Sequence, residues 1–229
     1  MEKVISDTVS VPNGLPSWIS KYLSSEEIER VSKTVETAEK KTSGEIVPVI
    51  VHSSSPVGHV GTTLFFVFLS LFFILDIVFV HGWSWDQRFE SSIACLVISA
   101  FLAWFLRRFH YVQRVFVPNH DELRCVEQRA ELEFHRQNVR HTHGETGILI
   151  FISVMERKAV VLADKAVAEL CPRDTWEKMV ADLLQNLKAG KWSEGLEKSI
   201  HHAGEILAEK FPLQSNDKNE LTNHLRILE

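Results

Sequence analysis

The chain is short of the residues on which several protein classes depend. Its 229 residues include only three cysteines, Cys95, Cys125 and Cys171, too few and too scattered for a disulfide framework. Its net charge is -5, whereas proteins that bind nucleic acid usually carry an excess of Lys and Arg to contact the phosphates. We therefore expect no nucleic-acid partner. The chain has no glycine-rich phosphate loop and no Ser in a nucleophile-elbow context, and we therefore assign no catalytic residue.

Long apolar stretches are absent from the first 60 residues, which excludes a cleaved signal peptide there. Apolar residues are concentrated in two later runs, Thr62–Val80, with the single charge Asp76, and Ile93–Leu106. About 20 apolar residues cross a bilayer, a length that the first run reaches and the second approaches if flanking arginines snorkel. The two runs predict a transmembrane hairpin; a buried core helix is the alternative for the second run.

Positive charge sets the expected orientation of this hairpin. Arg107, Arg108 and Arg114 follow the second run, whereas the connecting loop has one arginine against Asp86 and Glu90. The positive-inside rule then places both termini in the cytoplasm and the short loop outside. We expect an integral protein of the inner or plasma membrane. Its segments are 1–58, the first part of a soluble domain, 59–112, the hairpin, and 113–229, the second part of that domain.

Capping residues and hydrophobic periodicity predict the elements of the soluble domain. Ser24 and Glu27 form a capping-box pattern that begins a helix to about Lys41. The other expected elements are a strand at Glu45–His52, with Pro48 at an edge or bulge, a helix from Asn119 to about Arg140, strands at Gly147–Met155 and Lys158–Ala163, and helices starting at Asp174 and Ser193. The short gap between the second and third strands predicts an antiparallel pair. This order indicates an α/β domain with a small mixed sheet.

Several stretches follow one another in a distinctive order. They are Glu39–Ile46 (EKKTSGEI), Thr146–Phe151 with Glu156-Arg157, Leu162–Asp164, Trp176, Gly190–Ala203, and Phe211-Pro212 with Asp217–Leu221. In order and spacing they resemble the TPM domain family, which includes thylakoid acid-phosphatase-like proteins and short bacterial membrane-anchored members. The resemblance implies a three-layer α/β/α sandwich, interrupted here by the two-helix transmembrane hairpin.

The resemblance also implies an acidic pocket at one end of the sheet that binds a divalent cation. The matching ligands are Glu45, Asp164, Asp217 and Glu220. The residues themselves place Glu45 at the start of one strand and Asp164 at the end of another, and oxygen ligands suit Ca2+ or Mg2+. The alternative is that Asp164 caps a turn, Glu45 pairs with a lysine and the tail is solvated. Lys165 after Asp164 departs from the family pattern, and an ammonium there could replace a cation.

Two functions follow as expectations. The first is a membrane-anchored, non-enzymatic interaction or assembly module with Ca2+ or Mg2+ as its candidate ligand. The second is a metal-dependent acid phosphatase tethered to the membrane. The predicted hairpin makes the lipid bilayer an expected partner. By analogy with short TPM proteins, we also expect a membrane-protein partner, either LemA-like or another TPM protein.

Overall fold

The computed structural model describes residues 15–55, 58–79, 85–106, 108–109, 119–142, 144–172, 174–213 and 219–228. The described chain divides into two compact units. One, here called the α/β unit, is formed by residues within Met1–Ser54 and Leu123–Glu229. The other, the hairpin unit, is Ser55–Glu122 and encloses the predicted segment 59–112.

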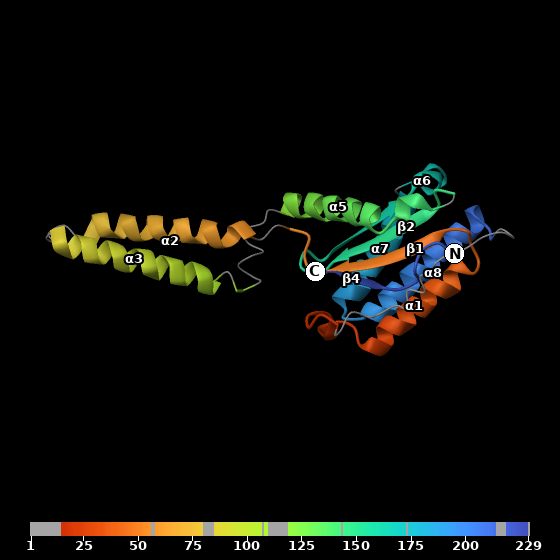
Figure 1. Ribbon diagram of the computed structural model, residues 1–229, viewed down its shortest axis with the longest axis horizontal. Coiled ribbons are helices and arrows are strands. Elements are labelled where there is room, and N and C mark those ends of the chain that lie inside the picture. Colours follow the sequence, from red (N-terminus) through yellow and green to blue (C-terminus); the bar gives the residue numbers. More distant parts are fainter. Residues whose placement is uncertain are drawn as a thin grey trace, which may run out of the picture. The chain divides into compact units, whose positions relative to one another are not determined.

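The helices and strands alternate irregularly along the chain (Figure 1). Their bounds are η1 Ile19–Lys21, α1 Ser25–Glu39, β1 Glu45–Val51, α2 Gly58–Phe79, α3 Trp85–Leu106, α5 Asn119–Arg136, η2 Val139–His141, β2 Gly147–Ser153, β3 Lys158–Ala163, α6 Lys165–Leu170, α7 Asp174–Lys188, α8 Trp192–Lys210 and β4 Arg226–Leu228.

The four described strands form one mixed sheet in the order β3-β2-β1-β4. β1 pairs in parallel with β2 from Glu45↔Gly147 to Val51↔Ser153, and with the short β4 over its last three residues. β2 and β3 are antiparallel neighbours, as the short gap between them predicts. The central strands are buried on both faces, which explains their nearly unbroken runs of Val, Ile and Leu.

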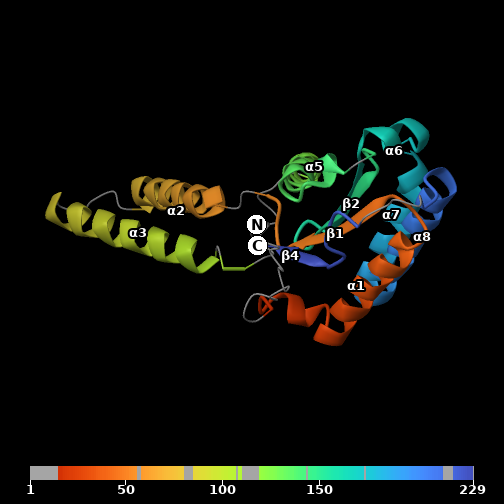
Figure 2. The same ribbon diagram turned by 45° about the vertical axis from the view of Figure 1, so that its right-hand side comes forward.

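Helices cover both faces of this sheet (Figures 1 and 2). On one face, alternate residues such as Ile46 and Ile148 share a core with α1, α7 and α8. On the other face, Val47 and Leu149 pack with Val126 and other residues of α5. The period-2 alternation of a strand therefore divides the apolar residues between two cores. The structure thus confirms an α/β fold with a small mixed sheet.

The first predicted helix begins at its predicted cap. The Ser24 hydroxyl accepts from the Glu27 amide, and the Glu27 carboxylate accepts from the Ser24 amide, so the capping box is complete. Pro48 lies in β1, which is an interior strand, but β4 reaches only from Val49 onward. Proline is tolerated because one side of β1 has no strand partner at that point among the described residues.

One α-helix and one strand in the described chain were not predicted, and two helices end earlier than expected. α6 follows directly after Asp164, and β4 forms from the last part of the tail. α1 ends at Glu39 and α5 at Arg136, short of the predicted Lys41 and Arg140. β4 has three residues, too few to show any periodicity in the sequence.

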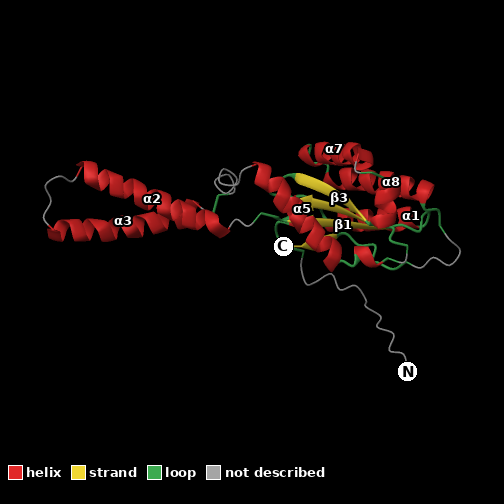
Figure 3. Ribbon diagram, turned by 90° about the horizontal axis from the view of Figure 1, so that it is seen from above, coloured by secondary structure: helices red, strands yellow, loops and turns green. Residues whose placement is uncertain are grey.

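The hairpin unit consists of α2 and α3, which pack against each other (Figure 3). Leu64 and Ala103 are buried between them, with Phe65, Phe68 and Leu106 beside them. Most other described side chains of both helices are large, apolar and exposed, as for Phe73 at 67%. Among the residues that the structure describes, no helix has both the length and the hydropathy required to cross a bilayer, so the predicted transmembrane hairpin is not supported there.

Candidate functional site: an acidic cavity where β1 begins

A cavity of about 310 Å³ opens in the α/β unit beside the start of β1. We call it the acidic cavity, because three carboxyl groups and two amide side chains line it. Its lining residues are Glu36, Glu39, Lys40, Thr42, Gly44, Glu45, Leu213, Asn219 and Asn223. They come from the end of α1, the turn into β1, the start of β1 and two segments that follow α8. Residues nearly 190 positions apart in the sequence therefore meet at one site.

The turn between α1 and β1 is fixed by hydrogen bonds and by close packing. The buried Thr42 hydroxyl donates to the Phe211 carbonyl oxygen at 2.6 Å and accepts from the Gly44 amide at 3.0 Å. A Cβ on Gly44 would lie 2.9 Å from Leu207 Cδ1 and 3.3 Å from the Thr146 carbonyl oxygen. This close approach explains the glycine of the Thr-Ser-Gly turn, and it positions Glu45 at the cavity.

Glu39 and Glu45 bring two carboxyl groups together in the cavity wall. Glu39 Oε1 accepts from the Ile46 amide at 2.8 Å, and Glu45 Oε1 accepts from the Glu220 amide at 2.9 Å. Burial, together with the charge of Glu45 and a hydrogen bond shared with it, raises the pKa of Glu39 to about 8, although the Ile46 amide opposes this effect. Glu39 therefore holds a proton at neutral pH beside a second, buried carboxyl group.

The polar groups nearer solvent are already paired with each other. Lys40 Nζ lies 2.7 Å from Glu36 Oε1 on α1, and this hydrogen bond lowers the pKa of Glu36. Asn219 Nδ2 donates to Asn223 Oδ1 at 2.7 Å. Glu36 is the lining acid that pairs with Lys40, and the other two, Glu39 and Glu45, are the inner carboxyl groups of the cavity. Carboxyl and amide oxygens of this kind are ligands for hard divalent cations.

The structure brings together two of the four predicted ligands. Glu45 is buried in the cavity wall, and Glu220 reaches it through its backbone amide, while the Glu220 side chain is not among those lining the cavity. Asp217 lies outside the described residues. Asp164 lies at the same end of the sheet, but β2 separates it from Glu45, since Gly147 pairs with Glu45 and its carbonyl accepts from the Asp164 amide.

Asp164 has a role in local structure. It is the N-cap of α6, and its Oδ1 accepts from the Lys165 amide at 2.8 Å. Its Oδ2 is buried and has no hydrogen-bond partner within the described part of the chain. The sequence left open whether Asp164 binds a cation or caps a turn. The cap is formed, and one oxygen remains for a further interaction.

No group of three His, Cys, Asp or Glu side chains arranged to hold a metal ion occurs in the residues that the structure places. The acidic cavity instead combines two inner carboxyl groups with amide and hydroxyl oxygens. Sequence reasoning did not identify Glu39, Asn219 or Asn223 as site residues. The sequence feature that could have identified Glu39 is its position, because it is an acid in the last turn of a helix, directly before the turn that leads to Glu45.

A family model described as TPM domain matches residues 108–206. These residues are therefore similar to a TPM domain. The matched residues run from the end of the hairpin unit through most of α8 and include Asp164. The resemblance found in the sequence is therefore confirmed. Glu39, Glu45, Asn219 and Asn223 lie outside the matched residues, so the family match does not extend to the acidic cavity.

One solved structure shows the same fold as this chain. It is the NMR structure of the BA42 protein from the psychrophilic bacterium Bizionia argentinensis, with a TM-score of 0.56 and 20% sequence identity. The alignment covers 90% of this chain and 95% of that one. At this identity the likeness concerns the fold. The chain matches no curated protein sequence.

Proposed function

We propose that the protein is a membrane-anchored TPM domain that acts as a binding module and holds a divalent cation in its acidic cavity. The observation that carries the anchoring is the apolar, exposed surface of the α2–α3 hairpin. The cation proposal is carried by the Glu39–Glu45 carboxyl pair. These two parts are independent, and each has its own test.

The hairpin unit leaves an unusual amount of apolar surface uncovered. Phe66, Phe73 and Ile74 of α2, and Val97 and Phe101 of α3, each expose about half or more of their surface. Soluble proteins rarely leave contiguous apolar patches of this kind, which mark contact with lipid or with another protein. The apolar run continues in the sequence to Val80, beyond the α2 side chains that the structure describes. Lipid is the occupant that we propose, with the α/β unit on the cytoplasmic side and the short loop outside.

A flotation assay with phosphatidylcholine vesicles tests the anchor. We expect the full chain to float with vesicles and to remain bound in 1 M salt, because the attachment is apolar. Leu71→Glu places a charge in the middle of the Thr62–Val80 run and should weaken insertion by about 2 to 3 kcal/mol. Leu170→Glu is the matched control, since Leu170 is equally exposed on α6 of the α/β unit. Failure of the full chain to float, or equal flotation of the two variants, would contradict the anchor.

The cation proposal rests on the chemistry of the acidic cavity. Glu39 Oε2 is buried and receives no hydrogen bond from a described donor, and Glu45 is buried beside it. A divalent cation would neutralise both carboxylates and displace the proton that Glu39 holds. Glu39 and Glu45 would supply carboxylate oxygens, and Asn219 and Asn223 amide oxygens. Asp217, Glu220 and Asp164 remain proposed ligands from the tail and from the same end of the sheet.

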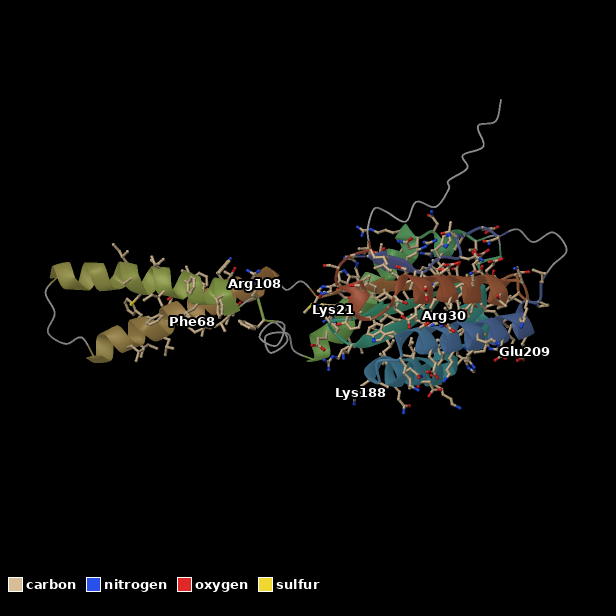
Figure 4. The ribbon with its side chains drawn as sticks, turned by 90° about the horizontal axis from the view of Figure 1, so that it is seen from below. Lys21, Arg30, Phe68, Arg108, Lys188 and Glu209 are labelled. Carbon is tan, nitrogen blue, oxygen red and sulfur yellow. The ribbon has the colours of Figure 1, made fainter. Side chains whose placement is uncertain are left out.

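Thermal unfolding of the full chain in detergent micelles, in EDTA and in 1 mM Ca2+ or Mg2+, tests this site. If 1 mM is tenfold above Kd, binding adds about 1.4 kcal/mol, or about 3 to 6 °C in Tm. Glu45→Gln should abolish that rise. Glu209→Gln is the control, because Glu209 is an exposed acid at the end of α8 (Figure 4) and is not one of the residues that line the cavity. Equal rises in both variants, or none in the unmodified chain, would refute the cation site.

A membrane-tethered phosphatase is the alternative. Phosphoryl transfer requires a cation together with donors for the phosphoryl oxygens and a positioned nucleophile. Lys40 is the cationic side chain in the cavity lining, and its ammonium already pairs with Glu36. We therefore propose binding rather than catalysis, with a LemA-like membrane protein or a second TPM protein as the partner.

A further inference from the structure

We propose that Trp104 and Arg108, at the end of α3, form a binding site for the headgroup of an anionic phospholipid. The proposal rests on the membrane anchor proposed above and adds which lipid the anchor selects. Three observations of the hairpin unit support it: the contact between these two side chains, the lack of an acidic partner for Arg108 among the residues that the structure describes, and the aromatic strip that continues from them.

The guanidinium of Arg108 lies over the indole ring of Trp104. Its Cζ is 5.9 Å from the ring centroid, within the range of a cation–π contact. The chain continues to turn after α3, since the Arg108 amide donates to the Phe105 carbonyl at 3.2 Å and the Phe109 amide to the Leu106 carbonyl at 3.0 Å. Arg108 is therefore four residues beyond Trp104 on one face of a helical turn, which brings the two side chains together.

A cation–π contact uses the charge of the Arg108 guanidinium but none of its N–H hydrogen-bond donors. No carboxylate forms an ion pair with Arg108 in the described part of the chain. Arg30 of α1 (Figure 4) is different. Its Nη2 donates to Ser193 at 3.2 Å, and its Nε lies 3.6 Å from Glu197 on α8. A planar guanidinium with unused donors matches a phosphate group, which it binds through two parallel hydrogen bonds.

Aromatic side chains continue from this pair along the outer surface of α3. The rings of Phe101 and Phe105 stack with centroids 6.3 Å apart, and Phe109 meets Phe105 edge-on at 5.3 Å. Trp104, Phe105 and Phe109 are each about half exposed. A cation at the end of an exposed aromatic strip fits a ligand with an anionic head and an apolar chain. Tryptophan and arginine also favour the depth at which lipid phosphates lie.

The expected orientation selects the class of lipid. The arginines that follow α3 place this end of the hairpin at the cytoplasmic surface. The cytoplasmic leaflet carries the anionic lipids, and a basic residue near it gains about fivefold in affinity for them. Phosphatidylglycerol is therefore a suitable probe, and the zwitterionic phosphatidylcholine is its neutral counterpart.

The test is the lipid that accompanies the full chain out of a defined bilayer. The chain is reconstituted in vesicles of equal parts phosphatidylcholine and phosphatidylglycerol, extracted in mild detergent, and its bound lipids are counted by mass spectrometry. We expect the bound lipid to be enriched several-fold in phosphatidylglycerol, and Arg108→Gln to reduce that enrichment about fivefold. Trp104→Leu should reduce it in part. Arg140→Gln, at an exposed arginine of the α/β unit, is the matched control and should leave it unchanged.

Each outcome separates this inference from the membrane anchor. If the unmodified chain neither floats with vesicles nor retains lipid, the anchor itself fails. If it floats and retains both lipids in the input ratio, the anchor stands and the headgroup site is refuted. Equal enrichment in the Arg108→Gln and Arg140→Gln variants would also refute the site. If chemical crosslinking joins two copies of the unmodified chain, and Arg108→Gln loses this crosslink while its lipid enrichment is unchanged, the surface binds a second protein copy and the headgroup site is refuted.

Discussion

Replacing Glu39 by glutamine should change how the stability of the α/β unit depends on pH. The amide oxygen of glutamine can accept from the Ile46 amide as Glu39 Oε1 does, so the local hydrogen bond is kept. The substitution therefore imitates the protonated carboxyl group and removes only its ionisation. Glu39→Gln isolates the cost of placing a second negative charge beside Glu45.

Because the pKa of Glu39 is raised in the folded state, the ionisation of Glu39 lowers the stability of the fold at high pH. Burial and Glu45 raise the pKa of Glu39 from 4.5 to about 8 in the folded protein, so the folded state binds this proton more tightly than the unfolded chain does. The stabilising effect is complete below pH 4.5 and is lost as pH rises to about 8. The difference between the folded and unfolded pKa of Glu39 corresponds to at most about 5 kcal/mol of folding free energy. This value falls to about 2 kcal/mol if partial exposure to solvent halves it.

Urea unfolding of the full chain in detergent with EDTA, at pH 5, 7 and 9, measures this effect. Tryptophan fluorescence reports on the α/β unit through the buried Trp176 and Trp192. At pH 5 the unmodified chain and Glu39→Gln should unfold at similar urea concentrations. At pH 9 the variant should be more stable by about 2 to 5 kcal/mol, or about 1 to 2.5 M urea for a slope near 2 kcal/mol/M.

Glu36→Gln is the matched control for Glu39→Gln. Glu36 lies one turn earlier on α1 and also lines the acidic cavity, but its hydrogen bond from Lys40 lowers its pKa. Glu36 is ionised from pH 5 upward, so its replacement should have the same small effect at pH 5 and pH 9. A stability difference between Glu39→Gln and the unmodified chain that stays constant across this range would refute the proposed carboxyl pair.

Three further outcomes follow from the structure. Gly147→Ala should destabilise the α/β unit by about 1 to 3 kcal/mol in urea, because its Cβ would lie 2.4 Å from the Val139 carbonyl oxygen; Gly144→Ala, where the nearest atom is 3.4 Å away, should not. Glu156→Ala should cost about 2 kcal/mol by the same assay, since the Ser53 hydroxyl (3.0 Å) and the Ser54 amide (3.2 Å) donate to this buried carboxylate; an unchanged midpoint would exclude it as a structural acceptor. Phosphomonoester turnover should stay at background with Ca2+ or Mg2+, and turnover that Glu45→Gln removes would favour the phosphatase.

Elements with strong local signals were predictable from the sequence. The Ser24–Glu27 capping box acts over three residues, and the β2–β3 pair is closed by a short turn. The unpredicted α6 also has a local cause, because Asp164 is its cap. The sequence analysis weighed Asp164 as a ligand, although an aspartate after a strand is also a common start for a helix.

The acidic cavity was only partly predictable, because tertiary contacts create it. Glu45 was expected at the rim of the sheet, and it lies there. Glu39 acquires its high pKa from burial and from Glu45, and neither is visible in the residues around it. The tail reaches the cavity through the hydrogen bond from the Glu220 amide to Glu45, a contact between residues 175 positions apart. No periodic pattern encodes a pairing over such a distance.

The pairing of β1 with β2 constrains the order in which the protein is made and folded. Glu45 leaves the ribosome about 100 residues before its partner Gly147, which is roughly 5 to 20 s at common elongation rates. During that interval β1 has no strand partner among the described strands, while α2 and α3 of the hairpin are synthesised. The sheet closes only afterwards, and β4, the last of the described strands to emerge, joins β1, the first of them. A pause in translation between the codons for Val51 and Gly147 would lengthen the time for which an uncovered β-branched segment is open to aggregation.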